Sequence, residues 1–122
     1  MSGIIKGTLA TGLVFALLTG AASAGQGLSE LQARKDAKLV LHRYFKGDWD
    51  YGYANRVRCG ARLSANKRRC RVSWIIGDLS YRGNVTINDP GGQTIYFSFV
   101  IRKINEYCLA TRGSNCVQVI AR

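Results

Sequence analysis

The sequence predicts an α+β domain in which one N-terminal helix packs on a curled antiparallel sheet of four or five strands. Three observations lead to this fold class. An amphipathic helical stretch comes first, a series of alternating apolar and polar segments follows, and four cysteines flank two of the intervening turns in pairs. Because the helical pattern and the strand patterns are segregated along the chain, a parallel βαβ arrangement is excluded.

The first residues predict a secretory signal peptide over residues 1–24. Lys6 is the only charge before Glu30, an apolar run follows it, and Ala22-Ser23-Ala24 supplies the small residues of a cleavage site. We therefore expect a single secreted domain, residues 25–122, exported through the Sec pathway with no membrane span after cleavage. The alternative is an uncleaved anchor, since the uncharged stretch is long enough to cross a bilayer.

The helix is predicted over residues 30–46. Ser29 and Gln32 have the spacing of a capping box, in which each side chain satisfies a free backbone N–H at the start of the helix. Gly47 is suited to end the helix. The apolar positions that recur at helical spacing are Ala33, Ala37, Val40, Leu41 and Tyr44, with Leu31 and Phe45 at the margins.

Alternating patterns predict strands over residues 56–62, 69–76, 81–88 and 94–103, with a short edge strand at 117–120. Turn-forming residues separate these segments at 64–66, 77–78, 88–92 and 111–115. An aromatic segment, residues 48–55, links the helix to the first strand. We expect Trp49 in this segment to close the core below the helix, and an exposed ligand-binding loop is the alternative.

The cysteines predict two disulfides, Cys59–Cys70 and Cys108–Cys116. Cys59 and Cys70 lie symmetrically about the first turn, where directly opposite residues of a hairpin are close enough to be bridged. Cys108 and Cys116 flank the last turn. A zinc site is the alternative, but the spacing lacks the paired short spacers of such sites. We expect no metal, and disulfides suit an extracellular location.

The chain carries little catalytic chemistry, so a non-enzymatic protein without a cofactor is expected. His42 is the only histidine and falls on the predicted helix, where packing or exposure explains it. Asp48 and Asp50 could form a carboxylate pair, but they lie in the linker beside glycine and aromatic residues, where solvated turn acids are the better interpretation. No nucleophile elbow, phosphate-binding loop or dinucleotide fingerprint is present.

The basic segment from Ala54 to Arg71 is the strongest functional signal, because it has seven cations and no acid. Alternation would gather arginines on one outer sheet face, where guanidinium groups can bind phosphate, sulfate or carboxylate. Tyr53, Tyr81 or Tyr96 could add stacking surface. The candidate polyanion-binding residues are Arg56, Arg58, Arg62, Arg69, Arg71 and Arg82.

Two interpretations of this basic face remain open. It could contact an anionic polymer or cell-surface component, with nucleic acid, a cell-wall polymer and lipid headgroups not distinguished. It could instead be a solvated face that keeps an open sheet soluble. The formal net charge of +11 favours attraction to anionic surfaces in either case. A protein partner is also compatible with the sequence.

The order of a signal segment, a helix, four strands and two cysteine pairs resembles the cystatin-like roll. The run Cys59-x-x-Arg62, Cys70-Arg71-Val72-x-Trp74 and Tyr81-x-Gly83 is also similar to small exported bacterial proteins of unknown function. The cystatin resemblance implies an alternative function, inhibition of a protease or another enzyme through a hairpin tip, here residues 74–78. This tip lacks the Gln-x-Val-x-Gly and Pro-Trp motifs of cystatins.

Overall fold

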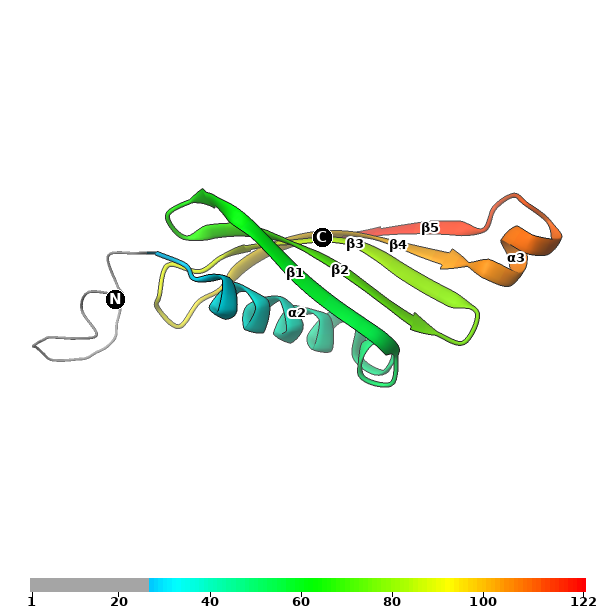
Figure 1. The fold of residues 1–122 in the computed structure, drawn as a ribbon, viewed down its shortest axis with the longest axis horizontal. Helices are drawn as coiled ribbons and strands as arrows, with labels where there is room; N and C mark the ends of the chain where they lie inside the picture. Colours follow the sequence, from blue (N-terminus) through cyan, green and yellow to red (C-terminus); the bar gives the residue numbers. More distant parts are fainter. Residues whose placement is uncertain (1–26) are drawn as a thin grey trace, which may run out of the picture.

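The computed structural model describes residues 27–122, so the expected signal segment lies outside the described residues. One long helix, α2 (Glu30–Asp50), precedes a five-stranded antiparallel sheet with the strand order β1-β2-β3-β4-β5 (Figure 1). The strands are β1 (Tyr53–Ser64), β2 (Lys67–Ile76), β3 (Leu79–Asn88), β4 (Tyr96–Asn105) and β5 (Val117–Ala121). The sheet does not close, because β1 and β5 are both edges, and the predicted α+β class is confirmed.

The helix begins where the capping pattern predicts, since the Ser29 hydroxyl accepts a hydrogen bond from the Gln32 N–H at 3.1 Å. Lys46 interrupts it with φ 41° and ψ −119°, but the chain then makes another helical turn to Asp50. The interruption agrees with the predicted end at residue 46, whereas the helical turn that follows it was not predicted. Leu31, expected at the margin of the buried stripe, is 58% exposed, whereas Asp36 is buried.

The core lies between α2 and the sheet face that α2 covers, and aromatic rings occupy one end of it. Trp74 is stacked on Tyr81, with ring centroids 4.4 Å apart and 4° between the planes. Phe45 and Trp49 of the helix meet the Trp74 ring edge-on at 5.3 and 5.1 Å. This contact confirms that Trp49 packs in the core, and it requires the extra helical turn after Lys46.

The strands agree with the predicted segments, although their ends differ. β1 begins earlier than expected, and β4 is displaced toward the C-terminus to Tyr96–Asn105. A short helix, α3 (Glu106–Thr111), was not predicted, and the Asn105 side chain caps it by accepting from the Cys108 N–H. The apolar segment after α3 forms the edge strand β5, which the pattern at 117–120 predicts.

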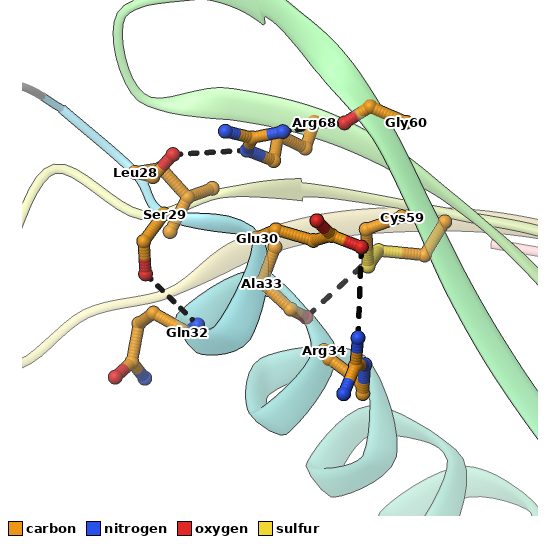
Figure 2. Close-up of a disulfide and its surroundings, with 10 residues drawn as sticks. Leu28, Ser29, Glu30, Gln32, Ala33, Arg34, Cys59, Gly60 and Arg68 are labelled. Carbon is orange, nitrogen blue, oxygen red and sulfur yellow. Dashed lines mark hydrogen bonds and ion pairs between the residues drawn. A yellow bond between two sulfur atoms is a disulfide. The ribbon is translucent and has the colours of Figure 1, made fainter.

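Both predicted disulfides are present, Cys59–Cys70 and Cys108–Cys116. The first joins directly paired residues of β1 and β2 and lies in the core, where the Cys70 sulfur is 3.9 Å from the Ala33 carbonyl oxygen of α2 (Figure 2). The second joins α3 to the chain that leads into β5. Each bridge closes a short loop.

Replacing Cys59 and Cys70 together by alanine is expected to lower the free energy of unfolding by about 3 kcal/mol. Cross-linking across 11 positions restricts the unfolded chain by roughly that amount in the loop-entropy description. Urea unfolding of the two proteins measures the difference. A loss below about 1 kcal/mol would contradict the structural role given to this bridge, and peptide mapping without reduction checks the pairing itself.

A candidate anion-binding groove

The sheet face turned away from α2, here called the outer face, has no described element packed on it (Figure 1). Successive residues of a strand point to opposite faces, and paired residues of neighbouring antiparallel strands point to the same face. On β2, Cys70, Val72 and Trp74 are buried toward the helix. The alternate residues Arg69, Arg71 and Ser73 therefore belong to the outer face.

Backbone pairing aligns the outer-face residues into two neighbouring rows that cross the strands. The first row consists of Arg56, Ser73, Arg82 and Arg102 on β1 to β4, in that order. The second row consists of Arg58, Arg71, Asn84 and Val100 on the same four strands. Because neighbouring strands are about 4.8 Å apart, each row spans roughly 14 Å.

These two rows line a groove of about 630 Å³. Five arginines contribute to it, Arg56 and Arg58 from β1, Arg71 from β2, Arg82 from β3 and Arg102 from β4. Val100 and Ile104 line it beside Arg102. All five arginines are exposed, so their guanidinium groups are accessible to a ligand.

None of the strands that the structure describes carries an acidic residue, because all seven Asp and Glu residues of the chain lie in its helices or turns. Among residues 27–122, the close contacts between acidic and basic side chains are Glu30 with Arg34 and Asp50 with His42, both on α2. The groove arginines therefore have no ion-pair partner within the described part of the chain. Clustered unpaired cations give this surface a positive potential.

The structure places Arg56, Arg58, Arg71 and Arg82 together in the groove, as alternation indicates. Arg69 shares the outer face and is paired with Thr86, but it lies outside the groove lining. Arg102 was missed, because β4 was read only as an apolar strand. Two signals place Arg102 on the outer face: it pairs with Arg82, and it alternates with the buried residues of β4.

Arg62 lies on the opposite face, which corrects the placement expected from unbroken alternation. Cys59 pairs with Cys70 and Arg62 pairs with Arg68, so β1 contains one more residue than β2 over this interval. This β-bulge reverses the direction of the following side chains. Arg68, on the helix side, donates to the carbonyl oxygens of Leu28 and Gly60 at 2.9 and 2.6 Å (Figure 2).

The tyrosines considered for stacking are also separated by the fold. Tyr81 is buried in the core, and its hydroxyl donates to Asp48 at 2.6 Å, so it cannot stack on a ligand at the outer face. Burial, and then the contact with Asp48, raises the pKa of Tyr81. Tyr53 and Tyr96 are exposed but are absent from the groove lining.

The other residues that the sequence suggested for catalysis or for inhibition through a hairpin tip have local structural roles. His42 is exposed and lies 2.8 Å from an Asp50 oxygen, and Asp48 accepts the hydrogen bond from Tyr81 instead of facing solvent as expected. In the hairpin tip 74–78, Trp74 belongs to the core, Ile75 and Ile76 are half-buried, and Gly77 and Asp78 are exposed. Within residues 27–122, no cluster of His, Cys, Asp or Glu could hold a metal ion.

Comparison with protein-family models, curated proteins and solved structures finds no match to this chain. The part of the chain that the structure describes contains no helix long and apolar enough to cross a membrane.

Proposed function

We propose that this protein is a secreted, non-enzymatic binding domain whose outer-face groove binds an anionic polymer or an anionic component of a cell surface. One observation carries the proposal. Five arginines from four neighbouring strands line one groove, and none of the described strands bears a carboxylate that could neutralise them.

Arginine is the side chain best suited to such a site. Its planar guanidinium group donates two parallel hydrogen bonds to phosphate, sulfate or carboxylate, and it stays charged at all physiological pH values. Five like charges in one groove also repel each other, and a bound anion removes this repulsion. Binding should therefore depend strongly on salt, because the groove is open to solvent.

Two features support secretion as part of the proposal. The pattern of residues 1–24 is that of a signal peptide, and the four cysteines form two disulfides, which are compatible with an oxidising compartment. The excess of positive charge suits a protein that meets anionic surfaces.

Replacing Arg58, Arg71 and Arg82 together by glutamine is expected to weaken binding to inorganic polyphosphate. Each arginine lost removes about one phosphate contact, so the slope of log affinity against log salt should become shallower by about 2 for three contacts. Fluorescence anisotropy with labelled polyphosphate at several salt concentrations measures both the affinity and the slope.

The matched control replaces Lys35, Lys38 and Arg43, three exposed cations of α2, by glutamine. It removes the same charge from the opposite side of the sheet. If the control weakens binding and flattens the slope as much as the groove variant does, only the net charge matters and the groove is not the site. Circular dichroism of both variants checks that the fold is retained.

A further inference from the structure

The outer face is divided into a cationic part and an aliphatic part. The arginines come from β1 to β4, whereas the outer-face residues that flank Arg102 on β4, Val100 and Ile104, and those of β5, Val117, Val119 and Ala121, are aliphatic. Val100 is 54% exposed and Val119 is 59% exposed. Val119 is paired with Arg102, and Val117 is paired with Ile104, so the aliphatic part begins directly beside the last arginine.

This aliphatic surface is continuous with the groove. Val100 and Ile104 line the groove together with Arg82 and Arg102. A ligand held by the arginines would therefore also contact hydrocarbon side chains on β4. Exposed aliphatic residues gathered at one end of a charged groove indicate that part of the ligand is itself apolar.

Among the described residues, none of those that line the groove is Phe, Tyr or Trp. Proteins that bind single-stranded nucleic acids without sequence preference generally stack bases on aromatic rings. Aliphatic side chains offer no such platform, but they suit a hydrocarbon chain. The composition of the groove therefore favours an acyl chain over nucleobases as the second part of the ligand.

We propose that the ligand of the groove is an anionic amphiphile, a phosphate-bearing headgroup joined to an acyl chain. The headgroup lies among Arg58, Arg71 and Arg82, and the chain extends across Val100, Ile104 and Val119. This proposal rests on the proposed function, because the same arginines hold the anionic group. A groove of about 630 Å³ is within the range of roughly 300–1,000 Å³ that holds small ligands in other proteins.

The test compares glycerol 3-phosphate, which has only the headgroup, with monoacyl glycerol phosphates of increasing chain length, all below their micelle-forming concentrations. Isothermal titration calorimetry of the disulfide-bonded protein should show affinity rising about two- to fourfold with each added methylene, because each buries hydrocarbon surface. Glycerol 3-phosphate should bind much more weakly.

Two variants separate the parts of the site. Replacing Val100 and Val119 together by threonine keeps their shape and β-branching, so the strands should be retained. It should reduce the chain-length dependence and leave the affinity for glycerol 3-phosphate unchanged. The triple Arg58, Arg71 and Arg82 variant should weaken binding of both ligands. The control, Leu31 and Leu39 to glutamine, removes two exposed aliphatic residues of α2 and should change neither.

The possible results are distinguishable. If glycerol 3-phosphate and polyphosphate bind but acyl chains add no affinity, or if the threonine variant keeps the full chain-length dependence, the amphiphile proposal is overturned and the proposed function stands. If a single-stranded oligonucleotide binds more tightly than the acyl phosphates per phosphate group, the ligand is a nucleic acid. If none of these anions binds, both proposals fail.

Discussion

Replacing Trp74 by alanine is expected to lower the free energy of unfolding by about 4 kcal/mol, a large share of the stability of a small domain. Trp74 is only 1% exposed, stacks on Tyr81 and receives the edges of Phe45 and Trp49. Truncation removes the shared partner of all three rings and leaves a cavity, and such changes typically cost 3–5 kcal/mol. The total free energy of unfolding of a small domain is about 5–15 kcal/mol.

Urea unfolding followed by far-ultraviolet circular dichroism measures this effect. The control is Leu39 to alanine, which removes an exposed aliphatic side chain from α2 and should change stability by less than about 0.5 kcal/mol. A Trp74 variant with stability within about 1 kcal/mol of the wild type would mean that the aromatic cluster does not hold the helix to the sheet.

The second large effect concerns pH and a buried acid of the helix. Asp36 is 3% exposed, accepts a hydrogen bond from the Gln32 side chain at 2.8 Å and faces the carboxylate of Asp89 in the β3–β4 turn. Burial, followed by the contact with Asp89, raises the pKa of Asp36 to about 7. The folded protein therefore binds a proton that the unfolded chain releases near pH 3.8.

A pKa raised by folding gives stability that is fully present below the unfolded value and is lost as pH rises toward the folded value. We expect the free energy of unfolding to fall between about pH 4 and 7, with a slope of up to about 1.4 kcal/mol per pH unit. Replacing Asp36 by asparagine, which has no proton to lose, should remove most of this fall. The variant should then gain about 3 kcal/mol relative to the wild type between pH 4.5 and 7.5.

Urea unfolding at both pH values tests this expectation. Asp78 to asparagine, which changes an exposed carboxylate in the β2–β3 turn, is the control and should preserve the pH dependence of the wild type. If the Asp36 variant keeps that dependence as well, another group is responsible for it.

Much of the fold could be predicted because it follows from local periodicity. The stripe that includes Ala33, Ala37 and Leu41 repeats at helical spacing and is buried. Cys70, Val72 and Trp74 alternate on β2 and face the helix. The Cys59–Cys70 bridge was predictable from a turn lying between the two cysteines, but the turn is at Ala65 and Asn66, and two register shifts in β1 bring Cys59 opposite Cys70.

The other features of the fold and of the groove depend on strand pairing and on contacts between distant parts of the chain, which the periodicity of the sequence does not encode. An extra residue between Cys59 and Arg62 turns Arg62 to the other face, and no feature of the local sequence required a bulge there. Arg102 joins the groove through pairing with β3, a contact between distant parts of the chain. Asp36 could not be recognised as buried, because its burial depends on the position of the β3–β4 turn.

Because α2 covers only one face of the sheet, the two faces should differ in how many amino-acid substitutions they tolerate. Buried contacts are concentrated on the helix side, whereas the groove side chains contribute little packing. Outer-face positions of β1 to β4 should therefore accept a wide range of residues, since surface substitutions usually alter stability by less than about 0.5 kcal/mol. A library randomised at those positions would retain folded members, which makes the sheet a scaffold whose binding preference can be selected separately from its stability.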